Sequence, residues 1–278
     1  MRKSASLQSR LVKDALFKCV IGVLAILLMV PLLFILGYIV SKGFPVFSWE
    51  FFTQLPKPVG ELGGGVSNAI VGSLMLMGLA TLFSVPFGVL IGVYLAENKT
   101  SKLAEFTRLC IDILQATPSI VMGIIAYVWI VVPMGGFSVL SGGIALALMM
   151  VPLISKSTEE TLRLIPESLK EAAYALGTPY YITMLKVIIP AGKKGILSGI
   201  LLGVARVSGE TAPLLFTAFG SPFMTTNVLK SANSLPLLIF NYATSPYQDW
   251  QNLAWGASLL LVLFVLSLSI LSKVVIKK

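Results

Sequence analysis

The chain has 278 residues, of which 56% are hydrophobic and 12% are charged, and its mean hydropathy is +0.90. Soluble domains carry about 25% charged residues, so this composition excludes an ordinary soluble protein and predicts an all-α membrane protein. The net charge of +9 does not indicate a nucleic-acid partner, because the basic residues flank apolar segments instead of forming one patch. The chain contains no histidine, and we predict neither a metal site nor a cofactor.

Apolar segments, of which the fifth is interrupted by Arg206 and Glu210, predict six membrane-spanning helices, each near the roughly 20 residues that cross the hydrocarbon core. Their expected ranges are 18–41, 66–96, 112–132, 139–156, 194–219 and 251–273. The first is too long for the apolar part of a cleavable signal peptide, so we expect a signal anchor. With this topology the basic residues outside the spans concentrate on one side, and only Lys42, Lys57 and Lys230 lie on the other. The positive-inside rule therefore predicts that both chain ends are cytoplasmic.

Two units are expected along the chain. Residues 1–65 would form the anchor span and an outside loop, and residues 66–278 the main transmembrane domain. In the outside loop, Ser48 is typical of a residue that N-caps a short helix over Trp49–Phe52. The short segment 133–138 predicts a tight turn, and hence a helical hairpin, between the third and fourth spans.

The longest inside segment, residues 157–193, predicts a helix, a bend and a second helix at the membrane surface. Pro166 is typical of a helix start and Gly177 of its end, and Pro179 would open the second helix, which we expect to stop at Pro190. The small side chains of Ala172, Ala173, Ala175 and Gly177 favour close approach by another protein. The alternative is an amphipathic connector that only covers the helix bundle.

The fifth predicted span contains two ionisable residues. Arg206 lies about 18 Å along the helix from Lys194, near the bilayer centre, and Glu210 follows one turn later. On a continuous helix both would share one face with Pro213 and Thr217, and with three glycines that permit close helix packing: Gly195, Gly199 and Gly203.

We interpret Arg206, Glu210 and Thr217 as part of a substrate path, because ionisable residues at this depth usually face a bundle interior or water. The planar guanidinium of Arg206 suits an oxyanion. Glu210 would hold Arg206 when the path is empty, and it would accept the hydroxyl of a partly protonated oxyanion. The alternative is an Arg206–Glu210 ion pair that only stabilises packing.

Other charged residues are interpreted as ordinary. We expect Asp112 to begin the third span, and Glu159 and Glu160 to be surface charges in the inside loop. The chain has no G-x-x-x-x-G-K-[ST] motif, so we predict that it does not hydrolyse ATP and is not an enzyme.

Two motifs resemble a known family. The run Glu171-Ala-Ala173 with Gly177 resembles the EAA loop of bacterial ABC-importer permeases, and A-R-V-S-G-E-T-A-P-L-L-F-T-A over 205–218 resembles the fifth span of PstA-type phosphate permeases. Pro118–Val121 and Gly63–Val66 also match, so the resemblance covers about residues 60–276.

This resemblance implies a type I ABC importer permease of the MetI-like fold, with six spans in a bacterial inner membrane. It implies import of inorganic phosphate, with an ATPase docked on Glu171, Ala172, Ala173 and Gly177. The implied partners are a PstC-type permease in a heterodimer, two PstB-type ATPase subunits that hydrolyse the ATP, and a PstS-type binding protein outside. The alternatives are a permease for molybdate or phosphonate, a secondary phosphate symporter, for which repeats and broken helices are expected, and a scaffold that does not transport.

Overall fold

The computed structural model describes the backbone of residues 2–61 and 63–277 and the side chains of residues 9–61 and 63–275. Within this part of the chain the regular structure is helical, and one isolated bridge joins Phe219 to Ala232. The longer helices are α1 (Arg2–Gly43), α3 (Ser67–Glu97), α4 (Lys102–Ala116), α7 (Val139–Arg163), α10 (Ile189–Val207) and α13 (Gln248–Lys277). The shorter segments are η1 (Phe44–Val46), α2 (Trp49–Thr53), α5 (Ser119–Ala126), η2 (Tyr127–Val131), α6 (Val132–Met134), α8 (Glu167–Ala175), α9 (Tyr180–Thr183), η3 (Met184–Ile188), α11 (Ala212–Leu215) and α12 (Leu235–Ala243).

Among the described residues, five helical stretches are long and apolar enough to cross a membrane. A sixth crossing results if α4 and the segment Ser119–Met134 are counted as one broken span. The predicted all-α, polytopic architecture is therefore confirmed, with five or six spans. The five stretches are Ser9–Val46, Ser67–Glu97, Val139–Arg163, Tyr180–Val207 and Gln248–Val275.

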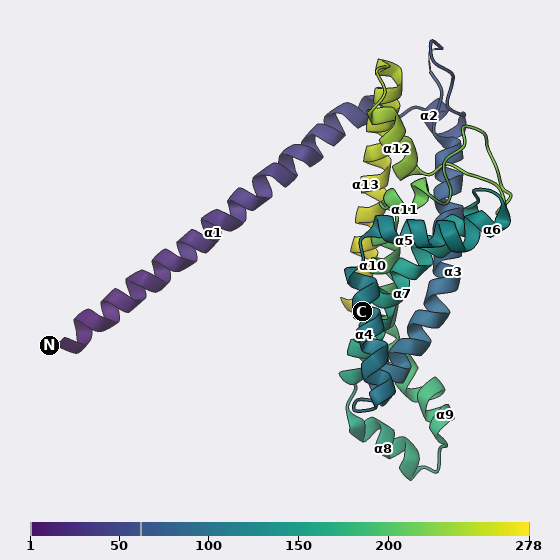
Figure 1. The fold of residues 1–278 in the computed structure, drawn as a ribbon. Helices are drawn as coiled ribbons and strands as arrows, with labels where there is room; N and C mark the ends of the chain where they lie inside the picture. The colour runs from purple at the N-terminus through teal and green to yellow at the C-terminus, as the bar shows by residue number, and fades with distance from the viewer. Residues whose placement is uncertain (1, 62, 278) are drawn as a thin grey trace.

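The prediction of a straight third span over 112–132 is wrong. α4 ends at Ala116, and the chain turns by 103° before α5 and its continuation to Met134. The cause is Pro118, which lacks an N–H and biases the residue before it towards extended backbone. Thr117 accordingly has ψ of 129°. The corner places α5 across the bundle (Figure 1).

The boundaries of the fifth predicted span are also wrong at both ends. At its start, the helix does not stop at Pro190, because α9, η3 and α10 follow one another from Tyr180 to Val207. At its end, α10 stops at Val207 instead of reaching residue 219. Gly209 is a weak helix former, and Pro213 cannot donate a helical hydrogen bond, so it lies in the first turn of the separate helix α11.

Helix α7 lies at the centre of the bundle, and glycines let two neighbours approach it closely (Figure 1). On the α3 side, a Cβ built on Gly88 would lie 2.8 Å from Cβ of Ile154. On the α10 side, a Cβ built on Gly195 would lie 2.5 Å from Cγ2 of Thr161, and one on Gly199 would overlap Ser157. Side chains larger than hydrogen at these positions would separate the helices.

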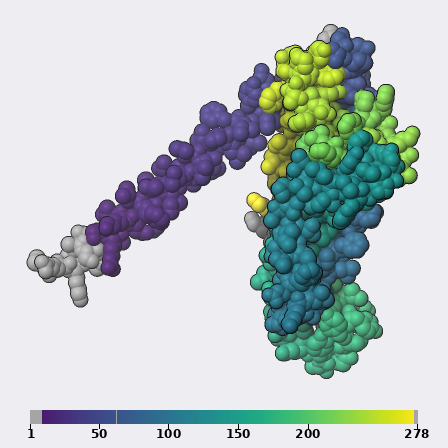
Figure 2. Space-filling view, viewed as in Figure 1, coloured from purple at the N-terminus to yellow at the C-terminus, as the bar shows by residue number. Residues whose placement is uncertain are grey.

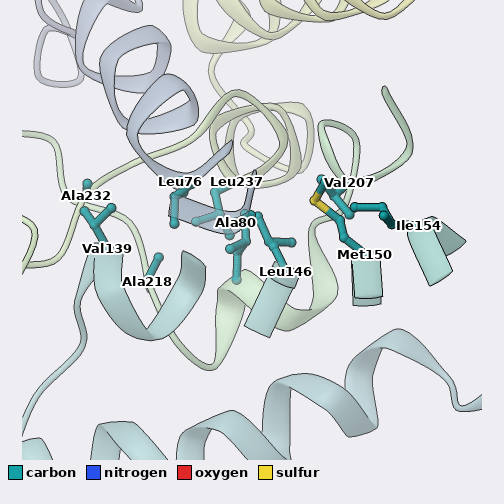
Figure 3. Packing of buried hydrophobic residues seen from close by; sticks show 11 residues of the cluster. Leu76, Ala80, Val139, Leu146, Met150, Ile154, Val207, Ala218, Ala232 and Leu237 are labelled. Carbon is teal, nitrogen blue, oxygen red and sulfur yellow. The ribbon is translucent and has the colours of Figure 1, made fainter. Parts of the chain in front are cut away.

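The largest core cluster fills the space between these helices (Figure 3). Leu76 and Ala80 of α3 pack towards Leu146 of α7, and Met150 lies beside Val207 near the end of α10. All of these side chains are at most 2% exposed. Burial of aliphatic side chains against one another fixes the end of α10, and hence the residues that follow it.

The N-terminal helix α1 leaves the bundle over most of its length (Figures 1 and 2). It contacts α13 only near its C-terminal end, where Tyr38 packs edge-on against Trp255 with ring centroids 5.1 Å apart. The following short helix α2 begins as predicted, because Ser48 Oγ accepts a hydrogen bond from Phe51 N at 3.2 Å. Phe51, 1% exposed, anchors this segment in a second core cluster.

Candidate substrate path and docking surface

Arg206 lies in the last turn of α10, and its side chain is exposed. The C-terminal end of a helix carries partial negative charge, so it favours a cation at this position. Within the described part of the chain, Arg206 forms no ion pair. Its guanidinium therefore projects from the surface of this chain with its donors available.

Glu210 lies beyond the end of α10 and is half-buried. Its backbone N–H donates to Val207 O at 3.1 Å, within the turn that joins α10 to α11. Because the helix ends before Glu210, the expected helical spacing to Arg206 is lost. The expected Arg206–Glu210 ion pair is not formed among the described residues.

Thr217 is fully buried, and its polar groups serve the fold. The hydroxyl donates to Pro213 O at 2.8 Å. The carbonyl accepts from Ser138 N at 3.0 Å and from Ser141 Oγ at 2.8 Å. Ser138 and Ser141 form the capping box of α7, so Thr217 ties the segment after α11 to the start of α7. The expected common face from Gly195 to Thr217 does not extend past the end of α10.

The turn after Arg206 is supported from the other side by α5. A Cβ built on Gly123 would lie 2.6 Å from Cα of Pro213, so only glycine allows α5 to pass this close to α11. Gly123 was not predicted as a functional residue. The signal in the sequence is a glycine five residues after Pro118, inside the third predicted span.

The predicted docking segment lies at one end of the bundle, where α8 and α9 project beyond the other helices (Figure 1). In α8, Ala173 is buried, whereas Glu171 and Ala172 are exposed. Gly177 has φ of +76°, and its N–H donates to Tyr174 O at 2.9 Å, so it ends α8 in a left-handed conformation that favours glycine. Next to it, Leu176 is 86% exposed, which makes an apolar side chain the most prominent feature of this surface.

Two ion pairs attach α8 to the nearby end of α3. Lys170 pairs with Glu97, and Lys99 Nζ lies 2.9 Å from Glu167 Oε1. The hydrogen bond from Lys99 and its positive charge lower the pKa of Glu167 below its ordinary value of 4.5. Both pairs lie at the end of the bundle that the basic-residue pattern predicts to be cytoplasmic.

Two further expectations about charged residues are wrong. Glu159 is 7% exposed, and its Oε1 lies 2.9 Å from Arg108 Nε and 2.7 Å from Arg163 Nη2. Arg108 also donates to Leu95 O at 2.9 Å, so it joins α4, α3 and α7. Asp112 does not begin a helix but lies inside α4, 2.5 Å from Lys156 Nζ. Among the described residues there is no group of three or more side chains that could bind a metal.

Comparisons with known proteins give one family and relatives that belong to transport systems. Residues 88–278 match the family described as binding-protein-dependent transport system inner membrane component. The phosphate transport system permease protein PstA of Yersinia pestis is 46% identical over 248 residues, which cover 89% of this chain and 84% of that protein. The probable PstA of Methanocaldococcus jannaschii is 40% identical over 260 residues, covering 93% and 92%.

A solved structure shares the fold. An inward-facing MetNI methionine ABC transporter chain aligns with a TM-score of 0.64 and 17% identity, covering 76% of this chain and 94% of that one. At this identity the likeness concerns the arrangement of helices alone.

Proposed function

The chain belongs to the family of binding-protein-dependent transport system inner membrane components, and from this membership we propose that it is the phosphate permease subunit of an ATP-driven importer. The observation that carries the proposal is the 40–46% identity, over most of both chains, to phosphate transport system permease proteins from a bacterium and an archaeon. The cargo is inorganic phosphate, and it crosses the cell membrane towards the cytoplasm.

Arg206 is the residue proposed to attract the anion. A bare guanidinium at the centre of a membrane helix costs about 2.5–3.5 kcal/mol on insertion scales. Arg206 is exposed on this chain and unpaired within its described part, so a water-filled path is the surrounding that would solvate it. Its fork geometry would bind two oxygens of phosphate with charge-assisted hydrogen bonds.

Glu210 is proposed to select among anions that reach Arg206. At the turn after α10 it is separate from Arg206, so a carboxylate remains available to accept the hydroxyl of hydrogen phosphate. Sulfate has no such hydroxyl and would meet only repulsion from the carboxylate. Thr217 is left out of the path, because its hydroxyl already donates to Pro213 O.

A second permease chain is proposed to complete the path opposite Arg206. The single chain leaves α1 uncovered, with side chains such as Leu28 and Phe34 at least 75% exposed. Lipid and a PstC-type permease would cover these surfaces. A PstS-type binding protein would deliver phosphate from outside.

The ATPase that supplies the energy for transport is proposed to bind at α8. A PstB-type ATPase would bind each permease at the segment from Glu171 to Gly177, where Leu176 offers an apolar contact. In this arrangement both chain ends and α8 lie on the cytoplasmic side, as the distribution of basic residues indicates.

A secondary symporter is the rival mechanism. Broken helices are typical of symporters, and the chain has such a break at Thr117, so a broken helix does not distinguish a symporter from an ATP-driven importer. Membership of the binding-protein-dependent transport family favours the importer. The experiment is phosphate uptake by the complex reconstituted in vesicles, with and without ATP on the cytoplasmic side. Uptake driven by an ion gradient without ATP, or preference for molybdate or phosphonate, would contradict the proposal.

A further inference from the structure

One aliphatic groove contains none of the residues proposed for the substrate path or the docking surface. It has a volume of about 630 Å³ and lies between α3, α10 and the end of α13. Its wall is aliphatic and includes Val89 of α3, Leu197 and Ile200 of α10, and Val275 of α13. Leu197 is 44% exposed, so the groove opens outwards.

A buried polar contact joins α10 and α13, two of the helices that line the groove. Ser198 Oγ of α10 and Ser272 Oγ of α13 are 2.5 Å apart, and the two residues are 4% and 2% exposed. A hydrogen bond between two hydroxyls in an apolar environment resists separation of the helices, because each hydroxyl would otherwise lose its partner. The groove is therefore a preformed feature of the α10–α13 contact.

Two lysines lie at one end of this groove. Lys193 and Lys194 line it near the start of α10, and both are exposed. Neither forms an ion pair within the described residues, and no carboxylate lines the groove. Val275 lies near the end of α13 and Val89 in the second half of α3, the parts that the proposed orientation places towards the cytoplasmic face.

We propose that this groove binds an anionic phospholipid of the cytoplasmic leaflet. The headgroup phosphate lies between Lys193 and Lys194, and one acyl chain lies along the aliphatic wall. Basic pockets between membrane helices on the cytoplasmic side are suited to anionic headgroups. An anionic lipid would contact both the lysines and the apolar wall. Free phosphate would contact only the lysines, and the positive group of a zwitterionic lipid would be repelled by them.

The test is native mass spectrometry of the purified complex titrated with phosphatidylglycerol or phosphatidylethanolamine of the same acyl chains. The wild type is expected to retain phosphatidylglycerol more tightly. A lysine near an anionic surface contributes about 1 kcal/mol, a factor of about five, so the double change Lys193→Gln with Lys194→Gln is expected to weaken retention by about thirty-fold. The matched control, Lys13→Gln with Lys102→Gln, removes the same charge from α1 and α4 and is expected to leave retention unchanged.

A second variant separates a lipid site from an ion site. Leu197→Trp fills the groove but keeps both lysines, and a half-exposed position tolerates the larger side chain. Phosphatidylglycerol retention is expected to fall. Unchanged retention in this variant would overturn the proposal in favour of an anion site at the lysines alone.

Other outcomes also overturn it. Equal retention of the two lipids by the wild type, or equal loss in the control variant, would remove the charge argument. A cross-link from Leu197→Cys to a helix of the second permease would show that protein fills the groove. These measurements follow lipid binding and not transport. A failure of the lipid proposal can therefore be distinguished from a failure of the phosphate assignment.

Discussion

Lys170 of α8 forms an ion pair with Glu97 at the end of α3, and the two side chains are only 22% and 14% exposed. Elsewhere on α8, Ala173 is the one buried residue, and the pair of Glu167 with Lys99 is exposed to solvent. A force applied to α8 would therefore pass through this pair to α3, which packs along α7 through Gly88. The pair is a physical link between the proposed docking surface and the helices of the path.

Charge reversal at this pair is expected to uncouple ATP hydrolysis from uptake. Lys170→Glu or Glu97→Lys alone places like charges together, and each is expected to lower phosphate uptake per ATP hydrolysed. The double reversal restores attraction and is expected to recover most of the coupling. Reversing the exposed pair Lys99–Glu167 is the comparison, and a smaller effect is expected there because solvent screens its charges. A double reversal that assembles but stays uncoupled would contradict the link.

Acidification is expected to loosen α8 only at low pH. The pKa of Glu167 is lowered below 4.5, mainly by its hydrogen bond from Lys99, so its contribution is complete above pH 4.5 and is lost as the pH falls through the lowered value. A spin label at Leu176→Cys should report constant mobility between about pH 5 and 8 and higher mobility below. Glu167→Gln should show the higher mobility throughout. A wild-type change inside the neutral range would refute this assignment.

The docking surface is best tested at Leu176. Gly177→Arg would strain a backbone with φ of +76°, whereas Leu176 has φ of −81° and is 86% exposed. Leu176→Arg is therefore expected to fold and insert normally but to lose the ATPase during co-purification. Leu229→Arg, in an exposed segment between α11 and α12, is the matched control. Retention of the ATPase by Leu176→Arg would remove the docking assignment.

The sequence predicts helices better than it predicts where they break. Pro86 and Pro118 both interrupt apolar segments, yet α3 runs through Pro86 and the chain turns at Pro118. A proline in a membrane helix is tolerated where neighbouring groups satisfy the freed backbone, and this depends on packing that local sequence does not specify. The N-cap at Ser48, in contrast, uses only a side chain three residues from its partner, and it was predicted correctly.

Charged residues show the same distinction between local and distant causes. Glu159 and Glu160 are adjacent and look equivalent in the sequence, but successive residues on a helix point about 100° apart. Only Glu159 faces Arg108, which comes from another helix 51 positions away. The docking segment was predicted from a contiguous motif, whereas Arg108 had no local pattern to indicate a buried partner.

Orientation is open to direct measurement. Thr226→Cys lies in the exposed segment before α12, and Glu171→Cys lies on α8, both in a background without Cys19 and Cys110. An impermeant thiol reagent added outside should label the first and spare the second in intact cells. Ser138 and Ser234 are unsuitable positions, because their buried hydroxyls cap α7 and α12. The opposite labelling pattern would reverse the proposed topology.

The last prediction separates the two interpretations of Arg206. Arg206→Gln keeps a polar side chain of similar size but removes the charge, and it is expected to abolish most uptake while the complex still assembles. A hydrogen bond to a charged group is worth about 1.5–3 kcal/mol, so uptake efficiency should fall by about 10- to 150-fold. Arg206→Lys keeps the charge without the fork and should mainly raise the KM for phosphate. Lys230→Gln, a basic residue outside the spans, is the control.

The double change Arg206→Gln with Glu210→Gln distinguishes binding from packing. If the two residues only neutralised each other, removing both charges would restore function, because two neutral side chains do not carry the desolvation cost of buried charges. The two residues form no ion pair in the described part of the chain, and Glu210 lies past the end of α10, so we expect neither charge to depend on the other for folding. The double variant should therefore assemble and remain inactive. Uptake near the wild-type rate would show that the charge of Arg206 is dispensable and would end its assignment to the path.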